Sequence, residues 1–228
     1  IGMPVANLIR EVIIDSKGFN WIGTDGGGLN LYDNDNDRFI RFSHKKGQKG
    51  SLASNSTRAI FEDRNGDLWV GTYPAGINFF DRSSGAISLY NNDPNNSNSL
   101  PHNSVLTLQE DAKGNLWLGT DGGGVSYFNR FDNTFKHYQV SNNKISSNAI
   151  LSSLLDSKGN FWVGTWGGAV NRYNPDRDSF DQIPFDLDLK GKGSGTYNAL
   201  NDEAVWNIYE DAAGKIWIGT HGGGLSLY

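Results

Sequence analysis

The chain of 228 residues contains no cysteine, which excludes disulfides, thiolate metal ligands and cysteine nucleophiles. A cysteine-free chain tolerates oxidising and reducing surroundings equally, so its absence leaves the compartment open. Positive charge is not in excess either: the formal net charge is −5, and we expect no binding to nucleic acid. The chain also lacks an apolar run of about 18 residues and a signal peptide's charged start and apolar core. We therefore expect no segment that spans a membrane.

The abundant residues form a repeat. Trp followed by an aliphatic residue, Gly and Thr occurs five times, at intervals of 45 to 55 residues. In every copy an Asp stands six residues before this Trp and a Gly three before it, while an aliphatic residue and an aromatic residue follow at eight and eleven. The repeat tryptophans are Trp21, Trp69, Trp117, Trp162 and Trp217. A period of this length is typical of a solenoid, a propeller or an array.

Each copy is predicted to form four short strands. In the third copy these are residues 103–110, 116–120, 125–128 and 135–138, and turn residues separate them. We name the turn between the first two strands, Asp-x-x-Gly, the aspartate turn, and the Gly-rich turn between the second and third strands the glycine turn. The second strand is apolar on both faces, as it must be when sheets pack on both sides of it. Four-stranded antiparallel sheets stacked radially satisfy this condition, so the sequence predicts an all-β fold, a β-propeller.

The glycines are interpreted as backbone devices rather than as a phosphate cradle. A phosphate loop needs a helix after its glycines, and here a strand follows each glycine turn. Glycine supplies positive φ in the turns, and within the second strand it leaves room for the neighbouring sheet. The chain is expected to be a single partial or complete propeller. Its blades are predicted at about residues 5–43, 53–91, 101–139, 146–184 and 201–228, and the last one lacks its fourth strand.

The third copy carries a resemblance to a known family. Asn103-Ser-Val, then Glu110-Asp-x-x-Gly-Asn-Leu-Trp-Leu-Gly-Thr, then Gly122-Gly-Gly-Val and Tyr127-Phe resemble the two-component regulator propeller repeat. The resemblance implies a part of a seven-bladed propeller from the extracytoplasmic, periplasmic sensor region of a bacterial inner-membrane receptor. It implies an output module that is a histidine kinase, a hybrid kinase-regulator or a diguanylate cyclase. With five repeats, we expect open blade ends through which the chain self-associates; the alternative is closure into a strained five-bladed ring.

One face of the blades is favoured for binding. Alternation of strand direction places the glycine turns and the connections between blades on the same face, and only these connections vary in length. The residue after each Gly-Thr also varies: it is Asp25, Tyr73, Asp121, Trp166 or His221. We expect these five residues to surround the channel mouth, with Tyr197 and Asn198 of the longest connection reaching over it. The ligand class indicated is a small molecule, a glycan or a peptide, neutral or basic; alternatively, Asp25 and Asp121 only cap their own turns.

No catalytic constellation is evident, and neither a cofactor nor a metal site is expected. Asp33, Asp35 and Asp37 alternate like calcium ligands, but the Gly and the closing Glu of such a loop are missing. The four histidines lack metal-ligand spacing. Sensing or partner binding without chemistry is therefore the first hypothesis. A propeller lyase or hydrolase, which would need a His and a Glu facing the centre, is the alternative, and a structural spacer is the third possibility.

Overall fold

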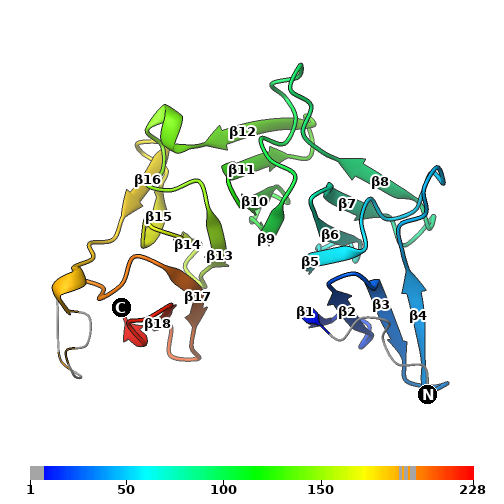
Figure 1. The fold of residues 1–228 in the computed structure, drawn as a ribbon, viewed down its shortest axis with the longest axis horizontal. Helices are drawn as coiled ribbons and strands as arrows, with labels where there is room; N and C mark the ends of the chain where they lie inside the picture. The colour runs from blue at the N-terminus through cyan, green and yellow to red at the C-terminus, as the bar shows by residue number, and fades with distance from the viewer. Residues whose placement is uncertain (1–7, 190–191, 193–194, 196–198) are drawn as a thin grey trace. The chain divides into compact units, whose positions relative to one another are not determined.

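The computed structural model describes residues 8–189, 192, 195 and 199–228, and this part of the chain is all-β (Figure 1). Five antiparallel sheets follow one another along the chain, and in each the strands pair in sequence order. The first four sheets have four strands and the fifth has three. The predicted fold class, four-stranded antiparallel propeller blades, is confirmed.

The strand bounds follow the repeat. The first sheet contains β1 (Ile9–Ile14), β2 (Asn20–Thr24), β3 (Gly28–Asp33) and β4 (Arg38–Phe42), and the second contains β5 (Ser56–Glu62), β6 (Leu68–Tyr73), β7 (Gly76–Phe80) and β8 (Ile87–Tyr90). The third contains β9 (Val105–Glu110), β10 (Leu116–Thr120), β11 (Gly124–Asn129) and β12 (Thr134–Tyr138). The fourth contains β13 (Ile150–Leu155), β14 (Phe161–Thr165), β15 (Val170–Asn174) and β16 (Ser179–Gln182), and the fifth contains β17 (Val205–Glu210), β18 (Ile216–Thr220) and β19 (Leu225–Leu227). Two single 3-10 turns, η1 (Val140–Asn142) and η2 (Leu187–Leu189), interrupt the connections.

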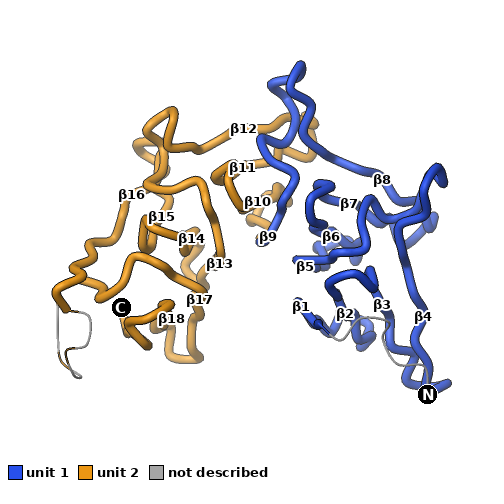
Figure 2. The backbone as a smooth tube through the Cα atoms, viewed as in Figure 1, with its two compact units in different colours: residues 1–108 blue, residues 109–228 orange. Residues whose placement is uncertain are grey.

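The chain divides into two compact units, residues 1–108 and 109–228, and the division falls within β9 (Figure 2). Each unit is described by itself. Unit 1 contains the sheets β1–β4 and β5–β8, and unit 2 contains β10–β12 and the two sheets that follow. The expected single domain over residues 1–228 stays a prediction.

The aspartate turns have the geometry that their spacing predicts. The glycine of every copy adopts a positive φ, between 76° and 86°, which an L-residue with a Cβ rarely adopts. These glycines are Gly18, Gly66, Gly114, Gly159 and Gly214. The aspartate before each glycine binds the turn: Asp15 Oδ1 accepts the backbone N–H groups of Lys17 and Phe19 at 3.0 and 2.8 Å. The first two strands of each blade are therefore joined by a turn whose backbone N–H groups are bound by its own aspartate.

The second strand of each blade is buried, as its apolar character predicts. All five residues of β10 and all five of β14 are buried, and β6 is buried except for Tyr73 at its end. The repeat Trp of β10 and that of β14 pack on the next blade within the same unit. Trp117 stacks on Phe161 of the next blade at 4.6 Å between ring centroids, and Tyr173 lies 4.9 Å from it. The core therefore lies between blades.

Glycine in the second strand makes this approach possible. A Cβ built on Gly71 would lie 2.6 Å from the carbonyl oxygen of Val105, and one on Gly164 would lie 2.7 Å from Cγ1 of Val205. Both neighbours belong to the first strand of the following blade. The expectation that this glycine leaves room for the adjacent sheet is confirmed.

Some apolar side chains of the first and last sheets are exposed. Val12 and Ile14 of β1 are 53% and 71% exposed, and Leu225 and Leu227 of β19 are 66% and 50% exposed. Whether these surfaces cause self-association stays a prediction. No helix among the described residues combines the length and the apolar character needed to cross a bilayer.

Candidate functional site

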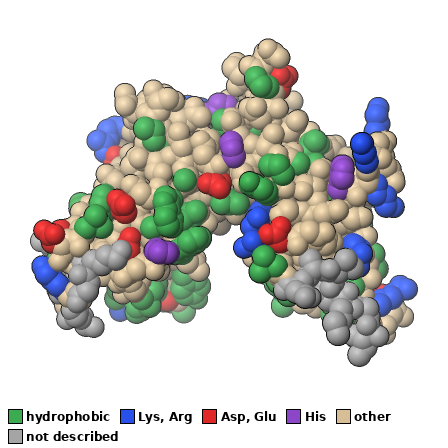
Figure 3. Space-filling view, viewed as in Figure 1, with side chains coloured by type: hydrophobic (Ala, Val, Ile, Leu, Met, Phe, Trp, Pro, Cys, Tyr) green, Lys and Arg blue, Asp and Glu red, His purple; other side chains and the backbone are tan. Residues whose placement is uncertain are grey.

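Three exposed rings meet on unit 2, and we name them the aromatic group: Trp166, Trp206 and His221. The Trp166 ring lies 6.0 Å from the Trp206 ring and 5.4 Å from the His221 ring, with interplanar angles of 70° and 67°. Trp206 and His221 are 6.2 Å apart. The two indoles are about half exposed, at 50% and 52%. Figure 3 shows a histidine beside hydrophobic side chains on this surface, over β13 and β17.

The backbone holds the aromatic group in place. The backbone N–H of Trp166 donates to the carbonyl of Ala149 at 2.9 Å, and the backbone carbonyl of Trp166 accepts the Ser147 hydroxyl at 2.8 Å. The backbone N–H of His221 donates to the carbonyl of Ala204 at 2.9 Å. Each of these bonds ties a glycine turn to the chain just before the first strand of a blade. The rings are thus presented by rigid elements, although they lie at the surface.

Trp206 reaches the aromatic group because β17 contains a bulge. Val205 pairs with Thr220 and Asn207 pairs with Gly219, so Trp206 has no partner in β18. A bulge redirects the side chain of the extra residue, and bulges are frequent next to functional sites. The same bulge recurs at Arg10 of β1, Arg58 of β5 and Leu151 of β13.

The corresponding surface of unit 1 is charged. Asp25 forms ion pairs with Arg10 at 2.8 Å and with Arg58 at 3.2 Å, and it accepts the Ser56 hydroxyl at 2.7 Å. The hydrogen bonds from Arg10 and Ser56 hold the pKa of Asp25 below its usual value. The Arg58 guanidinium lies 5.3 Å from the centroid of the Tyr73 ring, which is 44% exposed. We name Arg10, Arg58, Asp25 and Tyr73 the arginine group.

The structure brings the predicted residues together in part. The glycine turns do lie beside the connections: the N–H groups of Gly26 and Gly28 both donate to the carbonyl of Asn55. Among the five predicted residues, Trp166 and His221 meet in unit 2, and Asp25 and Tyr73 belong to one cluster in unit 1. Asp121 is exposed, and its backbone bridges Ala149.

Two predicted features remain, the pair in the longest connection and the role of the Asp25 carboxylate. Tyr197 and Asn198 lie outside the described residues. Asp25 was expected either to offer a free acid or to cap its own turn, but its carboxylate is occupied by two arginines from the first strands of two blades. Those arginines were not predicted as site residues, because their positions in the repeat lie inside a strand.

A sequence signal for the missed residues exists. Arg10, Arg58 and Trp206 all stand eleven residues before their repeat Trp, where the other two copies have Leu106 and Leu151. This position has three residue types among the five copies, and the position after Gly-Thr has four. Variation at a fixed register of an otherwise regular strand is therefore the signal that would have found them.

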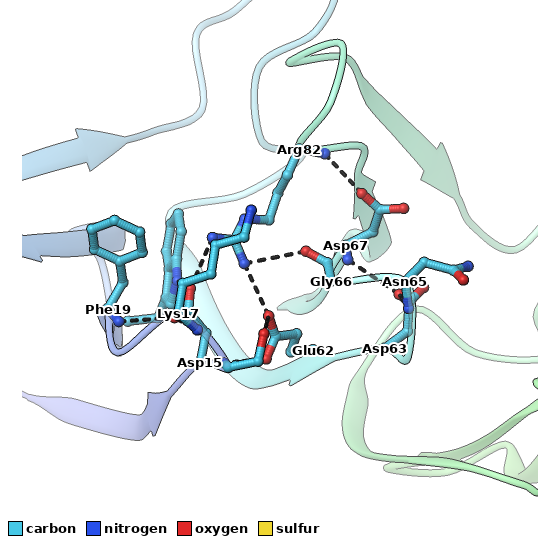
Figure 4. Close-up of polar contacts among 11 residues, drawn as sticks. Asp15, Lys17, Phe19, Glu62, Asp63, Asn65, Gly66, Asp67 and Arg82 are labelled. Atoms are coloured by element: carbon cyan, nitrogen blue, oxygen red, sulfur yellow. Dashed lines mark hydrogen bonds and ion pairs between the residues drawn. The ribbon is translucent and has the colours of Figure 1, made fainter.

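The opposite face, with the aspartate turns, is held by internal contacts. In unit 1, Arg82 pairs with Asp15 at 2.9 Å and with Glu62 at 3.1 Å (Figure 4). Glu62 also accepts the backbone N–H and the hydroxyl of Ser16 at 2.6 and 2.8 Å. Since Asp15 and Ser16 belong to the first blade and Glu62 and Arg82 to the second, these bonds join two blades.

Unit 2 repeats this contact. Glu210 accepts the backbone N–H and the hydroxyl of Ser157 at 2.7 and 2.6 Å, which joins the fourth blade to the fifth. The polar groups of these turns are thus engaged with one another, so their arrangement supports a stabilising role. Among the described residues there is no group of three or more His, Asp or Glu side chains that could hold a metal ion.

A comparison with known families identifies the repeat. Four segments match the family described as Two component regulator propeller: residues 51–73, 99–122, 144–167 and 199–222. Each runs from the connection before a blade to its glycine turn. The chain therefore carries the repeat of this family, and the resemblance seen in the sequence is confirmed. The copy around Trp21 lies outside the matched segments, but it forms the same four-stranded sheet.

Solved structures share the fold. An extracellular domain of a protein described as a hybrid two component system from B. thetaiotaomicron is 25% identical with a TM-score of 0.77, and the match covers 97% of this chain and 29% of that one. A second structure of that same extracellular domain, which describes the protein as a one component system, is 23% identical with a TM-score of 0.75 over 99% and 28%. Virginiamycin B lyase from Staphylococcus aureus is 13% identical with a TM-score of 0.66 over 96% and 69%.

The chain spans less than a third of that extracellular domain. No curated protein matches this chain.

Proposed function

We propose that this chain is a ligand-sensing or partner-binding part of the extracytoplasmic region of a bacterial signalling receptor. The observation that carries the proposal is the aromatic group, which exposes two tryptophans on rigid elements of a surface built from glycine turns. Contiguous exposed apolar patches on a protein surface mark interaction sites, whereas scattered single apolar residues do not. The extracellular domain with the same fold supports the extracytoplasmic location.

The chemistry of the aromatic group suits a neutral or basic ligand. A tryptophan face stacks on the apolar face of a sugar ring or on a peptide side chain, and it attracts cations through its quadrupole. Trp166 stands nearly perpendicular to both other rings, so the three rings form a corner rather than a flat patch. A corner contacts a ligand from two directions, which favours a small molecule, a glycan or a peptide over an extended flat surface.

A thermal-shift screen tests the proposal. Neutral oligosaccharides and basic or uncharged peptides are screened for an increase in melting temperature, since a ligand that binds only the folded state stabilises it. The best hit is then titrated against Trp166→Ala, Trp206→Ala and, as the matched control, Tyr209→Ala. Tyr209 is also on β17 and is 61% exposed, but it lies outside the aromatic group.

We expect at least a tenfold loss of affinity in both tryptophan variants, about 1.4 kcal/mol, and none in the control. If no compound in the screen stabilises the chain, the spacer hypothesis is favoured instead. Equal losses in all three variants would reject the aromatic group as the binding site.

The periplasm is the specific location that we propose. The parent protein would be anchored in the inner membrane and would carry its kinase or cyclase in the cytoplasm. Protease treatment of spheroplasts that express the full-length gene tests this, because an extracytoplasmic propeller is cleaved or released while a cytoplasmic output module is protected. Protection of the propeller in intact spheroplasts, with cleavage only after lysis, would place it in the cytoplasm and reject the proposal.

Catalysis is the alternative, and the likeness to virginiamycin B lyase favours testing it. A structure of that enzyme with a His→Ala substitution is described as catalytically inactive, so a histidine is needed there. In this chain His221 is the histidine of the aromatic group. Turnover of a lactone antibiotic, abolished by His221→Ala, would establish the enzyme. Binding without turnover supports the sensing proposal.

A further inference from the structure

The arginine group of unit 1 contains more donors than its acid can satisfy. Arg10 and Arg58 both reach the same carboxylate oxygen, Oδ2 of Asp25, at 2.8 and 3.2 Å. The other oxygen, Oδ1, accepts the Ser56 hydroxyl at 2.7 Å. A guanidinium has five N–H donors, and a carboxylate has two oxygens. One aspartate therefore leaves most of the donors of the two arginines without an acid.

The arginine group carries a net positive charge, and one of its donors is buried without an acceptor. Two guanidinium groups and one carboxylate leave a net charge of about +1 at this place, although the whole chain carries −5. Nε of Arg58 is buried and has no hydrogen-bond acceptor among the described residues. A buried donor without an acceptor is costly, and such atoms in native structures call for an explanation. The net positive charge, together with the donors that Asp25 leaves unsatisfied, therefore favours an acidic ligand at this place.

The group is held in position by the fold. Arg10 and Arg58 are the bulge residues of β1 and β5, so equivalent positions of two neighbouring blades turn toward the same aspartate. Asp25 itself is fixed by its backbone bridge to Ser56 and by the N–H bond that it donates to the carbonyl of Leu8. The side chains of Arg10 and Arg58 remain 36% and 23% exposed. Solvent-borne ligands therefore reach guanidinium groups that are already aligned.

Tyr73 adds a flat surface next to the guanidinium groups. Its ring is 44% exposed at the end of β6, and Arg58 lies over it at 5.3 Å. The hydroxyl of Ser54 donates to the carbonyl of Tyr73 at 2.7 Å, which fixes the backbone there. An aromatic face beside an arginine suits a molecule that has a ring and an acid on adjacent atoms.

We propose that Arg10, Arg58 and Tyr73 form a binding site for a small carboxylate ligand with a planar or ring-shaped body. The carboxylate accepts N–H groups at the exposed ends of the two guanidinium groups, and the body of the ligand packs on Tyr73. Asp25 aligns the arginines and competes with the ligand for them. This site shares no residue with the aromatic group, so it goes beyond the proposed function and does not depend on it.

Benzoate and benzamide are the probes that test the site, because they share a ring and differ in charge. The 228-residue chain is titrated with each, and the side-chain Nε–Hε signals of its arginines are followed by two-dimensional NMR. We expect benzoate to shift the Arg58 signal in a saturable way and to bind at least fivefold more tightly than benzamide. Equal effects of the two probes, or shifts spread over all arginines, would overturn the proposal.

Three variants locate the site. Arg58→Gln should weaken benzoate binding at least fivefold, and Arg10→Gln, at an exposed position, gives the same readout if the first variant does not fold. Arg41→Gln removes the same charge from an exposed position on β4 and should leave binding unchanged. A loss of affinity in Arg41→Gln as large as in the others would mean that only net charge matters, and it would reject the site.

Asp25→Asn gives the most specific result. A carboxylate that competes with the ligand is removed while its shape is kept, so benzoate should bind roughly fivefold more tightly or better. A role of Asp25 in structure alone predicts weaker or unchanged binding. Either of these outcomes would overturn the proposal that Asp25 occupies the place of a ligand acid.

Discussion

At the scale of single residues, one aspartate per blade explains the most regular part of the motif. Its Oδ1 accepts two backbone N–H groups of the turn. In the first, second, fourth and fifth blades its Oδ2 accepts the indole N–H of the repeat Trp six residues later. The indole bonds measure 2.8 to 2.9 Å for Trp21, Trp69, Trp162 and Trp217. In Asp211 the Trp217 bond and the turn amides hold the pKa of the carboxyl below its usual value. The regular spacing of Asp, Gly and Trp is thus explained by the hydrogen bonds of the aspartate to the turn and to the tryptophan.

The glycine of the aspartate turn should be sensitive to substitution. Gly66 has a φ of 81°, and a Cβ added there would meet only the Glu62 carboxylate oxygen, at 3.8 Å. A substitution at Gly66 is therefore unfavourable because of the backbone conformation, and not because a Cβ lacks space. Gly66→Ala should lower the free energy of unfolding by about 1 kcal/mol or more, and Gly66→Asn by less, because Asn tolerates the left-handed region. Urea denaturation of both variants measures this, and equal losses would contradict the conformational explanation.

The stability of the folded chain at low pH should depend on the charge of Asp178. Burial alone would raise the pKa of Asp178, but the Lys136 ammonium and the hydroxyls of Tyr138 and Tyr173 lower it from 3.8 to about 2. Because the folded pKa is the lower one, this contribution is complete above about pH 4 and disappears as the pH falls toward 2.

The matched substitution for that prediction is Asp178→Asn, which keeps the left-handed backbone of this residue, with φ 49°. Denaturation between pH 6 and pH 2 should show a smaller loss of stability in Asp178→Asn than in the unmodified chain. Asp176→Asn, at an exposed position two residues earlier, serves as the control and should behave like the unmodified chain. Parallel pH profiles of all three would contradict the role of Asp178.

At the scale of elements, the glycine in each second strand has a different use from the turn glycines. In Gly164 an added Cβ would lie 2.7 and 2.9 Å from Cγ1 and the carbonyl oxygen of Val205, in the next blade. In Gly219 the nearest atoms would be 3.9 Å away. Identical positions of the repeat therefore differ in whether a neighbouring strand is packed on them.

This difference predicts unequal effects of one substitution. Gly164→Ala should destabilise the chain by about 1 to 3 kcal/mol, because overpacking forces backbone or side chains apart. Gly219→Ala should cost well under 1 kcal/mol, since the added methyl meets only ordinary contacts. Thermal unfolding of both variants decides the matter. A similar loss in each would show that strand propensity, and not contact between blades, governs this position.

The sequence predicted the elements well and the site less well, for a physical reason. Turn geometry and burial depend on local residue types at fixed spacing, so the aspartate turns and the buried β10 and β14 follow from the repeat itself. The bulges at Arg10, Arg58 and Trp206 depend on pairing with a second strand, and a period-2 pattern does not reveal a residue without a partner. Candidate residues in turns were therefore found, while their partners in the first strands were missed.

At the scale of the whole molecule, stability comes from packing between successive blades within each unit. In unit 2 one core joins Trp117, Val125 and Tyr138 of the third blade to residues of the fourth, and another joins Trp162 and Val170 to the fifth. Unit 1 has an equivalent core around Trp21 and Leu68. Successive blades therefore support each other through nearest neighbours, as in other repeat proteins.

Trp117→Ala tests that packing against a surface position in the same copy. Trp117 is 5% exposed and contacts four aromatic rings of its own and the next blade closely, so its loss should cost about 3 to 5 kcal/mol. Asp121→Ala, at an exposed position four residues later, should cost less than about 0.5 kcal/mol. Urea midpoints measure both, and equal, small effects would contradict the inter-blade core.

The central claim is that the aromatic group binds the ligand, and the tryptophans themselves report on it. Of the seven tryptophans, five are the repeat residues of the second strands, and the other two are Trp166 and Trp206. The most direct measurement follows the seven indole N–H signals by NMR while the best compound of the screen is added. We predict that the Trp166 and Trp206 signals shift and that the signals of Trp21, Trp69, Trp162 and Trp217, bound to aspartates, stay in place. Saturable shifts in those four signals with Trp166 and Trp206 unchanged would contradict the claim.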